Sequence, residues 1–200
     1  ILVADLGIDQ VKIFRFDKAD RKMRQVDTLR CELQSGPRHF RFCPDRNYLY
    51  LLYELKNVVD VYHFSEGEKD SEVKLEKLQT ISTHNDKENN PLIAACQMRF
   101  SPDPDASHLF VSNAGINTIT IYDRDKATGL LTMKGSLPIA GEYPKDFCIF
   151  PDEKHLAVAN NESGTITFFN IDYEQGLLTM CARELEVDEP NSICMVECRG

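Results

Sequence analysis

An internal repeat restricts the possible folds of this chain more than any other feature of its sequence. Three segments align around a Pro-Asp pair: residues 41–64, 99–123 and 149–172. Each consists of a short apolar strand, a Pro-Asp turn, a second apolar strand, a polar turn and an alternating third strand. The prolines of these pairs are 58 and then 49 residues apart. Repeats of about this length, built from short strands, are typical of β-propeller blades.

The repeat also contains a fourth strand. The motif Gly-Leu-Leu-Thr-Met recurs in residues 125–137 and 172–185 and begins that strand. The segments TITIYD and TITFFNID alternate with period two, as half-buried antiparallel strands do. The sequence therefore predicts an all-β propeller with a single domain over residues 1–200. Its predicted parts are the last three strands of one blade at 1–34, full blades at 37–81, 94–138 and 144–186, and a closing strand at 191–198.

Both ends of this arrangement are incomplete blades. Exposed strand edges invite aggregation, and propellers normally close as rings. We therefore expect the chain to be the C-terminal part of a larger propeller, with 191–198 completing a blade that begins upstream. A closed four-bladed ring, in which 191–198 pairs with 1–34, is the alternative. Polar inserts at 65–76 and 82–91 lengthen the first period, and we interpret them as a hairpin tip and a loop.

Composition excludes several classes of protein. The net charge of −9 argues against a nucleic-acid partner, and no run of 18 apolar residues indicates a membrane-spanning helix. Seven scattered cysteines without a CxxC pair indicate free thiols in a reducing compartment, so we expect a cytoplasmic protein without metal or cofactor. No G-x-S-x-G, Walker or G-x-G-x-x-G motif occurs. We interpret the excess of acidic residues as solvated surface. The alternative is a protein in which a few cations at defined positions bind an anionic small molecule.

Three short motifs resemble those of a known family. They are DLGxDxV at 5–11, GPRHxxF at 36–42 and YELxN at 53–57. In this order they resemble the seven-bladed lactonase propellers, which include the cycloisomerase-2 type 6-phosphogluconolactonases and the fungal carboxymuconate lactonising enzyme. The resemblance covers essentially the whole chain. It implies a seven-bladed ring of which about four blades are present, with a cleft on one face.

The resemblance also implies site residues. The arginine of GPRH and the glutamate of YEL line the cleft in that family, which places Arg38 and Glu54 there. A histidine of the preceding blade would lie upstream of Ile1. This chain has Ala114 and Lys145 at two positions where the family has arginine, so Ala114 leaves the cleft without one of its expected cations.

The residue types suit the opening of a lactone ring by water. This reaction needs a base and a positive charge facing the developing oxyanion. We predict catalytic roles for Glu54 as base, Arg38 at the oxyanion and His39 as proton shuttle or phosphate ligand. Asn113 and Asn160 recur at equivalent places in consecutive blades, near the positions of Asp5 and Glu54, which predicts a polar ring. The predicted substrate-binding residues are Lys145, Asn113 and Asn160.

Two functions follow. The first is 6-phosphogluconolactonase-like hydrolysis of a small anionic sugar lactone by the full-length protein. This reaction converts 6-phosphogluconolactone to 6-phosphogluconate in the pentose phosphate pathway of carbohydrate metabolism. The alternative is a non-catalytic propeller that serves as a binding or interaction scaffold. Under the alternative, Arg38 and Glu54 form a structural salt bridge, and the two asparagines only stabilise turns.

Overall fold

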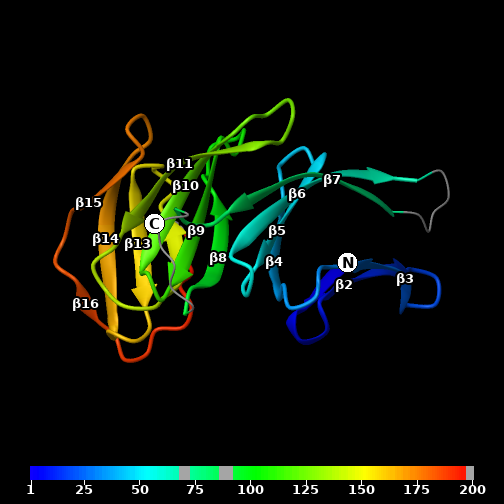
Figure 1. The fold of residues 1–200 in the computed structure, drawn as a ribbon, viewed down its shortest axis with the longest axis horizontal. Coiled ribbons are helices and arrows are strands. Elements are labelled where there is room, and N and C mark those ends of the chain that lie inside the picture. Colours follow the sequence, from blue (N-terminus) through cyan, green and yellow to red (C-terminus); the bar gives the residue numbers. More distant parts are fainter. Residues whose placement is uncertain (68–72, 86–91, 197–200) are drawn as a thin grey trace.

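The computed structural model describes residues 1–67, 73–85 and 92–196 and consists of four antiparallel sheets in chain order. We call these sheets blades 1 to 4. Figure 1 shows them in a row, with blade 1 at one end and the strands β14–β16 at the other. The predicted all-β class and propeller fold are therefore confirmed.

Blade 1 contains three strands, blades 2 and 3 contain four each, and blade 4 contains five. Blade 1 comprises β1 (Leu2–Asp5), the 3₁₀ turn η1 (Leu6–Ile8), β2 (Gln10–Asp17) and β3 (Lys22–Arg30). Blade 2 comprises β4 (Pro37–Phe42), β5 (Tyr48–Tyr53), β6 (Val58–Glu66) and β7 (Val73–Ser82). Blade 3 comprises β8 (Ala94–Phe100), β9 (His108–Ala114), β10 (Thr118–Arg124) and β11 (Leu131–Pro138). Blade 4 comprises β12 (Pro144–Ile149), β13 (His155–Asn160), β14 (Thr165–Asp172), β15 (Leu177–Met180) and β16 (Leu185–Glu186), which pairs with β14.

The two ends of the chain do not pair with each other in the described part. Residues 191–196 belong to no strand, and they bind blade 4 instead, where Ser192 Oγ and Ile193 N each donate to Asp146 Oδ2 at 3.0 Å. The closed four-bladed ring is therefore absent from the residues described. Because 197–200 lie outside them, the closing strand at 191–198 stays a prediction. The first insert forms the β6–β7 hairpin, while 68–72 and 86–91 lie outside the described residues.

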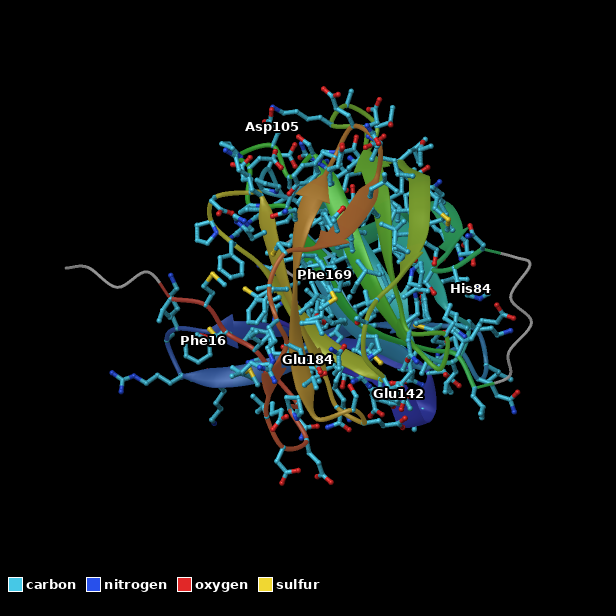
Figure 2. All side chains as sticks on the ribbon, turned by 90° about the vertical axis from the view of Figure 1, so that its left-hand side faces the viewer. Phe16, His84, Asp105, Glu142, Phe169 and Glu184 are labelled. Carbon is cyan, nitrogen blue, oxygen red and sulfur yellow. The ribbon has the colours of Figure 1, made fainter. Side chains whose placement is uncertain are left out.

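Apolar side chains fill the space between consecutive blades. One cluster joins Tyr50 of blade 2 to Met98 and Tyr122 of blade 3. Another joins Phe110 of blade 3 to Phe147 and Phe169 of blade 4, and Figure 2 shows Phe169 in the middle of its sheet. The middle strands are therefore covered on both faces, as in β5, whose six residues are all buried. Full burial of such a side chain stabilises the fold by about 1.5–3 kcal/mol.

Hydrogen bonds from one type of turn residue join each blade to the next. Asp9, Asn57 and Asn117 stand at the same place in successive hairpins, with φ of 53°, 54° and 53°. Asn and Asp adopt this left-handed conformation more readily than other non-glycine residues. Their side-chain oxygens accept N–H groups at the start of the next blade's first strand. The bonds run from Gly36 N to Asp9 Oδ1 (2.9 Å), from Ala95 N to Asn57 Oδ1 (2.9 Å) and from Tyr143 N to Asn117 Oδ1 (3.0 Å).

Proline decides which residue donates in these bonds. Pro37 and Pro144 begin β4 and β12, and proline has no N–H group, so the residue before each proline donates instead. β8 has Ala95 at this place, and Ala95 donates its own N–H. Among the residues described, the single helical element is the three-residue turn η1, and no helix is long and apolar enough to cross a membrane.

We expect Asn117 to contribute to stability both through this bond and through its backbone conformation. Asn117→Gly should lower the free energy of unfolding by about 1–3 kcal/mol, because it leaves Tyr143 N without its partner. Asn117→Ala should cost a further ~1–2 kcal/mol from left-handed strain. Asn117→Asp is the matched control, since aspartate serves at Asp9, and should stay near wild type. Urea denaturation measures all three, and equal stabilities for Gly and Asp would contradict the role of the bond.

Candidate functional site

The first strand of each full blade contains a β-bulge. The pairing register shifts at Arg38 in β4, at Cys96 in β8 and at Lys145 in β12. A bulge inserts one residue and redirects its side chain, and bulges are frequent beside functional sites. The three side chains therefore occupy equivalent places in consecutive blades, at the start of the innermost strands that face the central channel.

This level of the channel is close to one face of the molecule. Figure 2 labels Asp105, in the loop between β8 and β9, and Glu142, in the loop before β12, at opposite ends of the sheets. Because Arg38 and Lys145 come at the beginning of their strands, the site lies at the Glu142 end.

Arg38 and Glu54 form an ion pair at this end. Arg38 Nη1 donates to Glu54 Oε2, and Arg38 Nε donates to the carbonyl oxygen of Cys96 at 2.8 Å, which links blades 2 and 3. The side chains remain 27% and 19% exposed. Within the described residues, Nη2 of Arg38 and Oε1 of Glu54 make no hydrogen bond. A guanidinium donor and a carboxylate oxygen of one ion pair therefore remain available to a ligand.

Blade 4 contributes an aromatic ring and a second cation to the same neighbourhood. Lys145 Nζ lies 5.4 Å from the centre of the Tyr143 ring, a cation–π contact. Burial raises the pKa of the Tyr143 phenol, and the charges of Cys96 and Glu54 raise it further. Burial likewise raises the pKa of the Cys96 thiol, against the lowering effect of Arg38. Cys96 is 1% exposed and is a packing residue rather than a nucleophile.

Sequence reasoning missed Tyr143, although one signal was present. Tyr143 precedes Pro144 as Gly36 precedes Pro37, and both have positive φ, 59° and 63°. Glycine adopts this conformation without strain, whereas tyrosine does so at a cost. A tyrosine at the position where blade 2 has glycine therefore indicated a constrained side chain near the site.

The innermost strands carry a charge opposite to that of the whole chain. β4, β8 and β12 contain four cations, Arg38, Arg41, Arg99 and Lys145, against one carboxylate, Asp146. The chain as a whole has a net charge of −9. A local positive field on an acidic protein attracts small anions to the channel while the outer surface repels polyanions.

His39 lies one residue beyond the bulge of β4 and is a neutral imidazole. Burial lowers its pKa to about 4, and the positive charges of Arg38 and Arg41 act in the same direction. The Asp146 carboxylate acts in the opposite direction, and Arg99 lowers the pKa further. His39 is therefore uncharged near neutral pH, and its predicted role as proton shuttle or phosphate ligand stays a prediction, in which a neutral imidazole takes part.

The predicted ligands Asn113 and Asn160 are structural instead. Both are 0% exposed. Asn113 Nδ2 donates to Thr83 O at 2.7 Å, and Asn160 Nδ2 donates to Thr167 Oγ1 at 3.0 Å. The strand register aligns both asparagines with Tyr53 and not with Glu54. Fully buried amides bound to backbone and threonine cannot reach a substrate, so their substrate-binding roles and the polar ring at the cleft are corrected.

Comparison with known proteins now identifies the family. A model of the family described as lactonase, 7-bladed beta-propeller, matches residues 1–196. The chain belongs to this family. It is 30% identical over 154 residues to a 6-phosphogluconolactonase of Formosa agariphila, covering 74% of this chain and 41% of that relative.

Solved structures agree with this lactonase membership. The periplasmic gluconolactonase of Pseudomonas aeruginosa matches with a TM-score of 0.83 and 27% identity, over 94% of this chain and 51% of that one. A protein from Lactobacillus plantarum matches with a TM-score of 0.83 and 26% identity, over 96% of this chain and 53% of that one. The chain thus spans about half the length of the proteins it matches.

One position of this chain departs from the expected cleft. Ala114 follows Asn113 as Glu54 follows Tyr53, so it stands at the level of Glu54 in the next blade. Ala114 is 0% exposed, and it brings no charge to the place where the resemblance expects arginine. A cavity of about 420 Å³ lies elsewhere, between β3 and the strands β6 and β7, and neither Arg38 nor Glu54 lines it. Groups of three or more metal-ligating side chains are absent from the part of the chain described.

His39 should make stability depend on pH in a defined direction. Its folded pKa of about 4 lies below its ordinary value of 6.5, so the unfolded chain binds the proton first as pH falls. The contribution of neutral His39 is present above pH 6.5 and is lost as pH falls toward 4. We expect His39→Gln to flatten the decline in unfolding free energy between these values, measured by urea denaturation. An unchanged pH profile in the variant would show that His39 does not titrate in this way.

Proposed function

We propose that the full-length protein hydrolyses a phosphorylated sugar lactone, 6-phosphogluconolactone, to the open acid. The observation that carries this proposal is the Arg38–Glu54 pair, in which one guanidinium nitrogen and one carboxylate oxygen remain unbonded at a partly exposed, cationic end of the channel. The name of the Formosa agariphila relative supports the same substrate.

The proposed reaction uses the two free atoms in turn. Glu54 Oε1 takes a proton from water as the water oxygen attacks the lactone carbonyl carbon. The carbonyl oxygen becomes an oxyanion facing Arg38 Nη2, whose charge stabilises it. The carbonyl then reforms, the bond to the ring oxygen breaks, and the proton held by Glu54 passes to that leaving oxygen. Water is thus consumed, and a carboxylic acid and a hydroxyl group are formed.

Other residues assist binding in this scheme. Lys145 provides a point charge for the anionic substrate, and the ring of Tyr143 holds the ammonium group in place. Neutral His39 offers a hydrogen bond to a sugar hydroxyl. The net negative charge of the chain disfavours nucleic acid as a partner.

A cytoplasmic location is part of the proposal. The six cysteines that the structure describes are free thiols, two of them exposed. Exposed free thiols persist in reducing compartments and become oxidised elsewhere.

A non-catalytic scaffold is the second candidate, and two observations favour it. Ala114 brings no charge to the cleft. Arg38 also connects blades 2 and 3 through the Cys96 carbonyl, which is a structural role in itself. In this case the same face would bind a ligand or a protein without chemistry.

Replacing the two residues distinguishes these functions. We expect Arg38→Ala to lower kcat of the full-length protein for lactone hydrolysis by about 10²–10³-fold, as for the loss of one oxyanion donor. Glu54→Gln keeps the shape of the side chain and removes the base, so it should abolish turnover above the spontaneous background. Both rates are measured with correction for spontaneous hydrolysis, beside thermal melts.

Glu32→Gln is the control for these variants. Glu32 pairs with Lys56 at 2.8 Å on the surface and is 76% exposed, so its loss should leave kcat unchanged. If Arg38→Ala and Glu54→Gln melt normally and hydrolyse as fast as wild type, the catalytic assignment is wrong and the scaffold function replaces it.

A further inference from the structure

Two arginines lie at one level of the channel, deeper than the candidate site. Arg41 stands three residues beyond the bulge of β4, and Arg99 stands three residues beyond the bulge of β8. The strands β4 and β8 lie against each other. Two guanidinium groups from neighbouring blades therefore share this level, where β12 has Cys148.

Asp146 forms an ion pair with only one of these two arginines. Arg99 Nη2 donates to Asp146 Oδ1 at 2.9 Å. The same carboxylate also accepts from Gln97 Nε2, Ser192 Oγ and Ile193 N, each at 3.0 Å. Burial raises the pKa of Asp146, but the bonds from Ile193 and Arg99 outweigh this effect and hold the pKa below its ordinary value. Asp146 is thus a fully bonded carboxylate with no free capacity for Arg41.

Arg41 has no acidic partner among the described residues. Its Nη1 donates to the carbonyl oxygen of Phe40 at 3.0 Å, and no carboxylate lies within 4.0 Å of its guanidinium in the described part. Burial and the charge of Arg99 both lower the pKa of Arg41, and the Asp146 carboxylate acts in the opposite direction without contacting it. A partly buried cation beside a like charge is destabilising unless an anion compensates it.

Unused donors accompany this unbalanced charge. Nε of Arg99 is buried and has no hydrogen-bond partner. Nε and Nη2 of Arg41 form no hydrogen bond within the residues described. Buried donors are normally bonded, so the buried Nε of Arg99, next to an arginine with two unbonded nitrogens, indicates a missing acceptor with several oxygens.

We propose that Arg41 and Arg99 together bind a tetrahedral oxyanion, either inorganic phosphate or the phosphoryl group of a sugar ligand. Planar guanidinium forks match the oxygen atoms of phosphate in pairs, which a monatomic anion cannot reproduce. The site lies deeper in the channel than the Arg38–Glu54 pair and needs no catalysis to be filled. Only its link to a sugar ligand rests on the proposed function.

Calorimetric titration of the full-length protein with inorganic phosphate, at constant ionic strength in chloride, tests the site. We expect wild type to bind phosphate and Arg41→Gln to bind it about 10–100-fold more weakly, as for the loss of charge-assisted hydrogen bonds. Arg24→Gln is the matched control, because it removes the same charge from a 63% exposed side chain on β3 and should bind as wild type does. Absence of phosphate binding by wild type, or equal binding by Arg41→Gln, would overturn the proposal.

Thermal melting separates loss of the site from loss of the fold. Without phosphate, Arg41→Gln should melt no lower than wild type, because the substitution removes a like charge beside Arg99. Phosphate should raise the Tm of wild type and of Arg24→Gln but not that of Arg41→Gln. An equal rise in all three would again overturn the proposal.

Lactone kinetics identify the source of the anion. If the phosphoryl group belongs to the substrate, Arg41→Gln should raise KM for the phosphorylated lactone and leave KM for the unphosphorylated lactone unchanged. If both KM values are unchanged while calorimetry shows lost phosphate affinity, the site takes free phosphate. If wild type hydrolyses no lactone, the proposed function fails and calorimetry alone decides the anion site.

Discussion

The hydrogen bond between a left-handed Asn or Asp and the first N–H group of the following blade sets the geometry on which the rest of the structure depends. At Asp9, Asn57 and Asn117 this bond fixes where the next innermost strand begins. The bulge follows immediately, so the bond also fixes where Arg38, Cys96 and Lys145 point. Side chains from separate blades thereby meet at one end of the channel, because each blade starts from the same anchored turn.

Charge is distributed by the same repeat. Only the innermost strands face the channel, and four of the cations of an acidic chain lie on three of these strands. Two of them have protein partners, in the pairs Arg38–Glu54 and Arg99–Asp146. Lys145 rests on an aromatic ring, and Arg41 is left without a counter-ion in the part described. The channel therefore favours anions at the level of Arg38 and Lys145 and at the level of Arg41 and Arg99, although the net charge of the molecule repels them.

Equivalent positions of the repeat carry different residues with different contacts. The place of Tyr53 is occupied by Asn113 in blade 3 and Asn160 in blade 4, where each amide binds threonine hydroxyls inside its own blade. One residue further along the chain, Glu54 reaches the channel while Ala114 is buried. A shift of one residue in a strand moves a side chain to the other face. The position of Asn113 and Asn160, which are buried inside their blades, and the position of Glu54, which reaches the channel, are thus one residue apart in the repeat.

The sequence by itself determined the fold class and the strands of the three full blades, because Pro-Asp turns and period-two alternation are local signals that each repeat confirms. The resemblance of its motifs GPRH and YELxN to those of the lactonase propellers also predicted that Arg38 and Glu54 line one cleft, and the structure pairs the two side chains. Only the tertiary structure decided that His39 is neutral, that Asn113 and Asn160 are buried, and that Tyr143 and Arg41 have the neighbours they do. These properties depend on burial, and for His39 and Arg41 also on the charges of Arg99 and Asp146 in other blades. The position of each bulge and the register of each strand pair decide which side chains come within reach of one another. A repeat pattern in the sequence does not give these two features with single-residue precision.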